Sequence, residues 1–123
     1  MSIERKNLET QLDNLVRTIV NKRDNGRCVL CGDNYAVGVS HFIKRNKSAV
    51  RWTLINCHLM CQRCHGEWER NENEKYYEFM VYKYSANTVI SLNRETRHPE
   101  KFTIDDLKIK KLDLQLQMEA FSG

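Results

Sequence analysis

The sequence lacks the features that would place it among membrane, secreted or multidomain proteins. Its 123 residues leave little room for a second domain, and it has neither an internal repeat nor a low-complexity segment. No apolar run approaches the ~20 residues that span a bilayer. The polar start, Met1-Ser2-Ile3-Glu4-Arg5-Lys6, has no signal-peptide apolar region. We therefore expect one soluble domain inside the cell.

A strong excess of one charge is also absent. The chain has 20 Lys plus Arg against 16 Asp plus Glu, a formal net charge of +4. This mild excess suits a polyanionic partner without requiring one. Hydrophobic residues make up 41% of the chain, which is too high a share for a disordered protein. The composition therefore indicates a folded domain with a modest core.

What the sequence does contain is a patterned set of cysteines. Four of the five form two Cys-x-x-Cys pairs, Cys28/Cys31 and Cys61/Cys64. An odd number of cysteines without an export signal argues against a disulfide framework. Thiolates are soft ligands, and two such pairs can place four sulfurs around one ion. We therefore predict a structural zinc site, with unrelated buried thiols as the alternative.

Other residues near the pairs leave alternatives for this site. The fifth cysteine, Cys57, is expected to pack as a small hydrophobic side chain. His58 and His65 could compete as zinc ligands, but the symmetry of the two pairs favours the four cysteines. A thioredoxin-like redox pair would need only one Cys-x-x-Cys beside a βαβ pattern, which the sequence does not have.

Apolar periodicity predicts a helix at each end of the chain. Leu8, Leu12, Leu15, Val16 and Ile19 recur at spacings typical of one helix face over residues 3–24. Ser2 is suited to cap this helix, and the dipeptide at 25–26, Asn-Gly, to end it. At the other end, Thr103 with an acidic residue three places on predicts the start of a helix over residues 103–120.

Between these helices the pattern is mixed. Residues 27–43 predict the first cysteine pair and then a hairpin, with a turn at 33–34 and His41 in or at the end of a strand. Residues 62–84 predict one helix, and residues 85–102, which hold the only proline, a connection. Residues 44–55 carry basic but no acidic side chains, and we interpret them as a phosphate-contacting rather than a merely solvated loop. The basic residues of this loop are Lys44, Arg45, Lys47 and Arg51.

The residues around the two pairs resemble the HNH, or ββα-metal, nuclease family. The matching stretch is Cys28-x2-Cys31 … Ser40-His41 … Asn56-x4-Cys61-x2-Cys64-His65, about a third of the chain. Within that family it is most similar to the phage NinG/Rap recombination nucleases, whose strand histidine is followed by an aromatic and basic residues. Two positions depart from the pattern. Ser40 stands where many HNH enzymes have an aspartate ligand, and His65 stands where NinG-like proteins often have asparagine.

The resemblance implies an α+β fold with a zinc-stapled ββα-metal (HNH) core and flanking N- and C-terminal helices. Residues 1–123 would form a single domain. Within it, residues 1–25 would form the N-terminal helix, residues 26–84 the zinc-bound core, and residues 85–123 the connection and C-terminal helix.

The resemblance also implies a role for each site residue. His41 would be the general base, because the pKa of imidazole lies near neutrality. Asn56 would orient the His41 ring and hold the loop to the strand. His65 would bind a catalytic divalent ion, Mg²⁺ or Mn²⁺. Arg51 would clamp a phosphate. The flanking DNA backbone would be held by Lys44, Arg45 and Lys47.

The implied function is cleavage of phosphodiester bonds in DNA, with branched recombination intermediates such as Holliday junctions as the suggested substrate. Symmetric cutting of a junction needs two active sites, so a homodimer is expected, with the first or last helix as its interface. A phage-encoded protein of this kind would act in the cytoplasm of its bacterial host. Two other hypotheses are a non-catalytic zinc-dependent nucleic-acid-binding module and a zinc-held adaptor for proteins.

Overall fold

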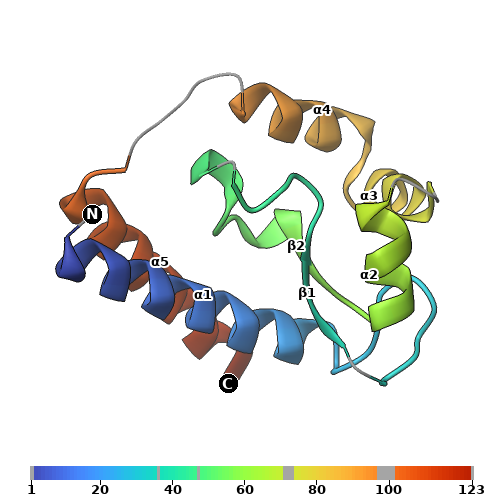
Figure 1. Cartoon of the computed structure of the whole chain (residues 1–123), viewed down its shortest axis with the longest axis horizontal. Helices are drawn as coiled ribbons and strands as arrows, with labels where there is room; N and C mark the ends of the chain where they lie inside the picture. The colour runs from blue at the N-terminus through green and yellow to red at the C-terminus, as the bar shows by residue number, and fades with distance from the viewer. Residues whose placement is uncertain (1, 36, 47, 71–73, 97–101, 123) are drawn as a thin grey trace.

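The chain folds into a helix-rich α+β structure around a small two-stranded sheet (Figure 1). The computed structural model describes residues 2–35, 37–46, 48–70, 74–96 and 102–122. The predicted α+β class is confirmed. Two short 3₁₀ helices, Ser48–Val50 and Leu54–Asn56, lie between the strands. The main elements are α1 (Ile3–Arg23), β1 (Gly38–His41), β2 (Cys57–Met60), α2 (Gln62–Glu69), α3 (Lys75–Tyr84), α4 (Ala86–Glu95) and α5 (Ile104–Ser122).

The two terminal helices begin as the sequence predicts. Ser2 Oγ accepts a hydrogen bond from the backbone amide of Arg5 at 3.1 Å. Thr103 and Asp106 form a capping box, in which the side chain of each accepts from the backbone amide of the other at 3.1 and 2.8 Å. Past the end of α1, Asn25 and Gly26 adopt φ values of 56° and 68°, the left-handed conformation that ends many helices.

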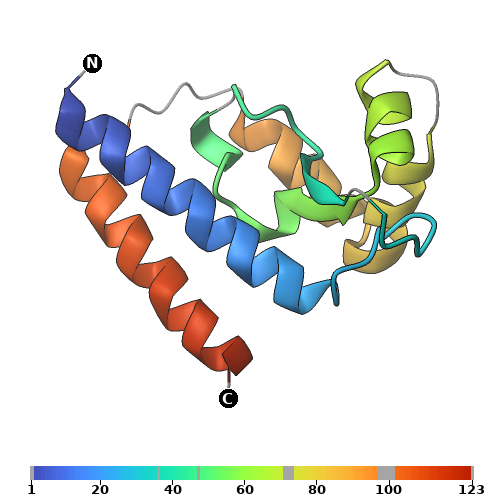
Figure 2. The same cartoon turned by 60° about the horizontal axis from the view of Figure 1, so that its bottom comes forward.

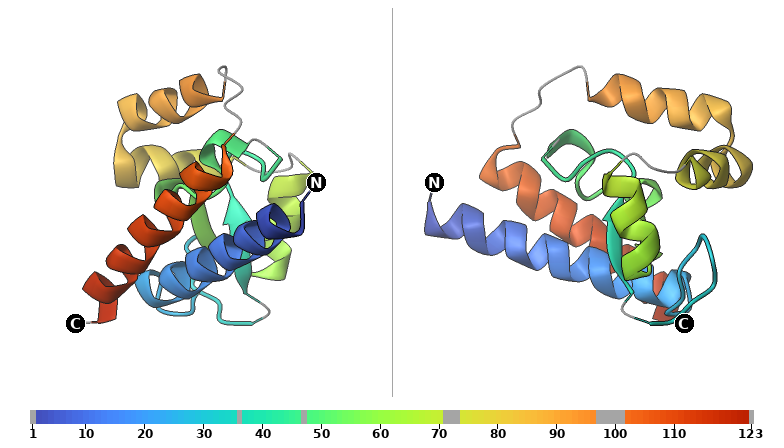
Figure 3. Two further views of the ribbon diagram at one scale, coloured as in Figure 1. Left: turned by 90° about the vertical axis from the view of Figure 1, so that its left-hand side faces the viewer. Right: turned by 45° about the vertical axis from the view of Figure 1, so that its right-hand side comes forward.

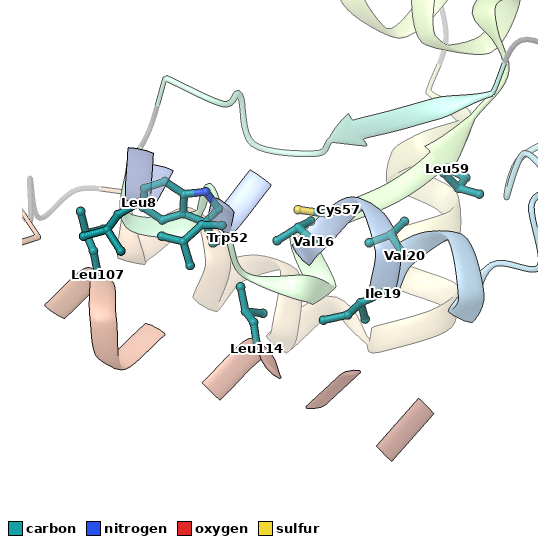
Figure 4. Close-up of a cluster of buried hydrophobic side chains, with 10 residues drawn as sticks. Leu8, Val16, Ile19, Val20, Trp52, Cys57, Leu59, Leu107 and Leu114 are labelled. Carbon is teal, nitrogen blue, oxygen red and sulfur yellow. The ribbon is translucent and has the colours of Figure 1, made fainter. Parts of the chain in front are cut away.

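Helices α1 and α5 lie side by side and share a core with the sheet and the loop between its two strands (Figures 2 and 4). Each large apolar side chain buried there contributes about 1.5–3 kcal/mol. Trp52 and Cys57 belong to this core, so the prediction that Cys57 packs as a hydrophobe is confirmed. The other buried members are Leu8, Leu12, Val16, Ile19, Val20, Leu59, Leu107 and Leu114.

A partly buried ion pair fixes the end of α1 to the sheet. Arg23 Nε lies 2.9 Å from the carboxylate of Asp24. The same guanidinium donates to the carbonyl oxygens of Leu54, at 2.9 Å, and of Cys57. Asp24 also accepts from the backbone amide of Leu59 at 3.0 Å. These bonds hold β2 against α1. They also give hydrogen-bond partners to the carbonyls of Leu54 and Cys57 and to the amide of Leu59.

The two strands pair antiparallel, with Gly38 opposite Met60 and His41 opposite Cys57. The predicted hairpin within residues 27–43 is therefore wrong, because the partner of β1 lies beyond residue 56. The turn at 33–34 closes the cysteine loop instead. Asp33 accepts from the amide of Tyr35 at 3.0 Å through its side chain, and its carbonyl accepts from Cys28 at 2.8 Å. Strand β2 gave no alternating signal because all of its residues are buried.

The predicted single helix over residues 62–84 is also wrong. Helix α2 ends at Glu69, and α3 begins at Lys75. Residues eight apart in a continuous helix are separated by about 12 Å along its axis. Yet the rings of Trp68 and Tyr76 lie 5.0 Å apart, and both contact Phe42. Packing of these aromatic rings around one side chain therefore requires two helices.

The predicted connection over residues 85–102 contains a helix, α4. Ser85 caps it, with its hydroxyl oxygen accepting from the amide of Thr88 at 3.3 Å. The buried residues of α4, Val89 and Leu92, are three positions apart, which is a helical spacing. Two apolar positions are too few to distinguish a short helix from a connection. Residues 97–101, with the proline of this connection, lie outside the described residues.

The strands lie between the α1–α5 pair and the α3–α4 pair (Figures 1 and 3). On the α3 side His58 is fully buried, and its two ring nitrogens lie 2.9 and 2.8 Å from the hydroxyls of Tyr76 and Tyr84. His58 is thus a packing residue and not a competing zinc ligand. Within the described ranges, none of the helices combines the length and the apolar character needed to cross a membrane.

Candidate metal centre and active-site pocket

The two Cys-x-x-Cys pairs converge on one point. The sulfur atoms of Cys28, Cys31, Cys61 and Cys64 all lie within 4.8 Å of one another, and those of Cys31 and Cys61 are 3.7 Å apart. Four thiolates around one zinc ion at about 2.3 Å would be separated by about 3.8 Å. The cluster could therefore bind zinc with little rearrangement, as the spacing predicts.

Local structure suits the first pair to bind a metal. After Cys31, Gly32 adopts a φ of 80°, and its amide donates to the carbonyl of Cys28 at 2.9 Å. Burial opposes ionisation of the Cys28 thiol, but hydrogen bonds from backbone amides outweigh it and lower its pKa to about 7. The thiolate is the metal-binding form. Cys57 differs, because burial raises the pKa of its thiol to about 12.

His41 ends β1 with one ring nitrogen tied to the backbone. Its Nε2 lies 3.0 Å from the carbonyl oxygen of Arg51. A carbonyl only accepts, so Nε2 carries the proton and the neutral ring keeps the lone pair on Nδ1. Burial lowers the pKa of His41, although the Arg51 carbonyl and Asp13 oppose the shift. The ring is therefore neutral at pH 7 and able to accept a proton through Nδ1.

Asn56 holds the loop between the strands. Its buried side chain accepts from the amide of Ile43 at 2.7 Å and donates to the carbonyls of Ile43 and Val50 at 3.0 and 3.2 Å. The amide group is thereby committed to the loop. The expectation that Asn56 orients the His41 ring is corrected, because the Arg51 carbonyl holds that ring instead.

His65 lies in the first turn of α2, next to a carboxylate. Its Nε2 is 3.2 Å from Glu69 Oε1, and about half of each side chain is exposed. His65 and His41 line the same pocket, which has a volume of about 630 Å³. The pocket thus brings together two of the three residues implied as catalytic. Its charged lining also includes Asp13, Arg17, Lys44, Arg45, Arg51 and Glu69.

Two of the basic loop residues are paired with α1. Asp13 Oδ2 lies 2.8 Å from Arg45 and 2.7 Å from Arg51. Arg51 also lies over the Trp52 ring, 4.9 Å from its centroid. Lys44 is exposed on the pocket wall, and Lys47 lies outside the described residues.

The family model described as bacteriophage lambda NinG protein matches residues 3–122, nearly the whole chain. The chain belongs to the NinG family. Membership in this family implies a recombination-related role in phage. Searches of curated proteins and of solved structures find no match.

The NinG match covers α1, for which the sequence predicted an amphipathic helix and a candidate dimer interface but no pocket residue. Asp13 and Arg17 of this helix nevertheless line the pocket, as does Glu69 of α2. A signal for the first two was available. Each follows a buried residue of α1, Leu12 and Val16, and the two are spaced four apart, which places them on one edge of the buried stripe. Sequence alone did not show what that edge faces.

Proposed function

We propose that this NinG-family chain is a metal-dependent endonuclease of the HNH class that hydrolyses phosphodiester bonds in DNA. The observation that carries the proposal is the state of His41. Its neutral ring is fixed through Nε2 to a backbone carbonyl and lies on the wall of a charged pocket that His65 shares.

In this proposal His41 is the general base. Nδ1 takes a proton from a water molecule, and the hydroxide attacks phosphorus. The bond from phosphorus to the 3′ oxygen breaks, leaving a 5′-phosphate and, after protonation by solvent, a 3′-hydroxyl. Because the pKa of His41 lies below its usual value, the base is available at neutral pH.

His65 is the proposed protein ligand for a catalytic Mg²⁺ or Mn²⁺. The donor set suits such an ion, since Glu69 adds a carboxylate oxygen beside the imidazole. An ion bound there would supply positive charge to stabilise the leaving oxygen. The four-cysteine zinc site would be structural, because four sulfurs leave no open position for water.

Basic side chains around the pocket are proposed to hold the DNA backbone. Lys44 and Arg45 are exposed, and Arg51 and Arg17 complete the basic lining. Guanidinium groups bind phosphate with two parallel hydrogen bonds. Lys47 belongs to the same proposal on the basis of its place in the sequence.

The proposed substrate is branched recombination DNA such as a Holliday junction, and the proposed assembly is a homodimer. A recombination-related family supports a branched substrate. Resolution by paired cuts needs two active sites related by a two-fold axis.

The test compares a four-way junction with a matched linear duplex, each with Mg²⁺, Mn²⁺ or EDTA. Wild-type protein is expected to cut the junction only with a divalent ion, and His41→Ala to lose at least about 100-fold in rate. Tyr82→Ala changes a side chain that is 93% exposed on α3 and serves as the control.

Equal cutting of junction and duplex would contradict the proposed preference for branched DNA but would still support nuclease activity. DNA binding without cutting, whichever ion is added, would contradict the nuclease proposal. It would instead support a non-catalytic zinc-dependent nucleic-acid-binding module.

A further inference from the structure

One carboxylate of α1 gathers the side chains of three residues from the loop that follows β1. Asp13 Oδ2 accepts from Arg45 at 2.8 Å and from Arg51 Nη2 at 2.7 Å. Asp13 Oδ1 accepts from Arg51 Nε at 3.2 Å and from the indole N–H of Trp52 at 2.9 Å. This side chain is only 23% exposed, and charge-assisted hydrogen bonds of this kind are strong.

One of the residues that Asp13 holds, Arg51, also holds His41. The Arg51 carbonyl lies 3.0 Å from Nε2 of His41, and Trp52 is buried in the core that joins α1 and α5. Glu9, one turn before Asp13, lies 3.7 Å from Arg51 and supports the same side chain. A single path of hydrogen bonds therefore runs from α1 through residue 51 to the histidine ring.

We propose that Asp13 is a positioning residue for His41, acting through Arg51 to fix the tautomer and direction of the ring. The proposal rests on the proposed function, because it assigns the residue that keeps the general base ready. Asp13 does not touch the reacting atoms. This role would add α1 to the active site, although the stretch that resembles HNH nucleases runs only from Cys28 to His65.

Asp13 also competes with DNA for two of the proposed phosphate-binding residues. Its carboxylate neutralises Arg45 and Arg51, which lie on the pocket wall with Arg17 and Lys44. Removing this charge leaves the arginines available to phosphate. Loss of Asp13 should therefore lower turnover without weakening DNA binding, whereas loss of a merely structural residue would lower both.

The experiment compares Asp13→Asn with wild type and with Glu78→Gln, which removes one negative charge from an exposed position of α3. Asparagine offers one acceptor oxygen and no charge, so it cannot hold both arginines and the indole. Asp13→Asn is expected to lower kcat for junction cleavage at least about 10-fold, with Kd for the junction unchanged or tighter. Asp13→Glu keeps the carboxylate and should recover most of the loss.

A second readout does not depend on cleavage. In ¹⁵N spectra of the imidazole ring, wild type should show His41 as the neutral tautomer protonated on Nε2. Asp13→Asn should show a mixture of tautomers, and Glu78→Gln the wild-type spectrum. Groups that also charge this pocket, His65 and Glu69 of α2, are unchanged in each variant.

Three results would overturn the role of Asp13. They are an unchanged kcat in Asp13→Asn, a parallel loss of kcat and junction binding that glutamate does not rescue, and an unchanged His41 ring spectrum. If wild-type protein does not cut DNA, the proposed function fails. The ring spectrum then still decides whether Asp13 holds His41.

Discussion

At the scale of single residues, the spacing of residues along the sequence predicted which side chains could bind a metal. It did not predict how the side chains are oriented. The two Cys-x-x-Cys pairs predicted a four-sulfur cluster, because short loops leave few ways to arrange such pairs. The sequence placed His41 in or at the end of a strand, and the resemblance attributed the orientation of its ring to Asn56. The partner is a backbone carbonyl, and any residue type at position 51 supplies one. Sequence patterns do not reveal such contacts.

The buried His58 makes stability depend on pH. Burial lowers its pKa to about 3 in the folded chain, against 6.5 for an unperturbed histidine. The unfolded state therefore binds the proton first. Stability from the neutral ring is fully present above pH 6.5 and is lost as pH falls toward 3, at up to about 1.4 kcal/mol per pH unit.

Urea unfolding of wild type and His58→Gln between pH 7 and 5 measures this dependence. The variant should be less stable at pH 7, because glutamine fits the two tyrosine hydroxyls poorly, and its stability should fall less steeply. Parallel slopes for the two proteins would show that another group causes the loss.

At the scale of elements, local signals were sufficient at the ends of the chain and failed in the middle. Caps and apolar stripes defined α1 and α5, because those signals lie within the helices themselves. The pairing of β1 with β2 joins residues 38–41 to residues 57–60, and no local pattern specifies so distant a partner. The break between α2 and α3 depends on aromatic packing around Phe42, which is also nonlocal.

A zinc ion bound by the four cysteines would link the loop after α1 to the start of α2. Cys31→Ser is expected to lose bound zinc and to lower the unfolding temperature, since structural zinc contributes directly to folding. Cys57→Ala is the matched control, because Cys57 lies in the core formed by α1 and α5. It should keep one zinc per chain while losing some stability.

Metal analysis of the purified variants and a thermal melt with and without a chelator provide the measurement. Wild-type zinc content in Cys31→Ser, or loss of zinc in Cys57→Ala, would contradict the assignment of ligands.

At the scale of the whole molecule, α5 has an apolar side that the described residues do not cover. Ile109, Leu112 and Leu116 are 68%, 57% and 57% exposed, at spacings that place them along one side of the helix. The opposite residues, Leu107 and Leu114, are buried against α1. This side is the place where we expect the proposed homodimer to form.

Leu112→Lys should therefore convert a dimer into a monomer at micromolar concentration, as light scattering after gel filtration would measure. Tyr82→Lys places the same charge on the exposed side of α3 and should leave the mass unchanged. A wild-type protein that is monomeric at all concentrations would contradict the proposed dimer.

A single-turnover rate of DNA cleavage decides whether His41 is the base of a DNA-cleaving site. Protein in excess over an end-labelled four-way junction is mixed with Mn²⁺, and strand cleavage is followed for wild type and His41→Ala at matched occupancy. We expect metal-dependent cuts with 5′-phosphate ends and a rate at least about 100-fold lower in the variant. Equal rates for the two proteins, or no cleavage by wild type at saturating protein, would contradict this role of His41.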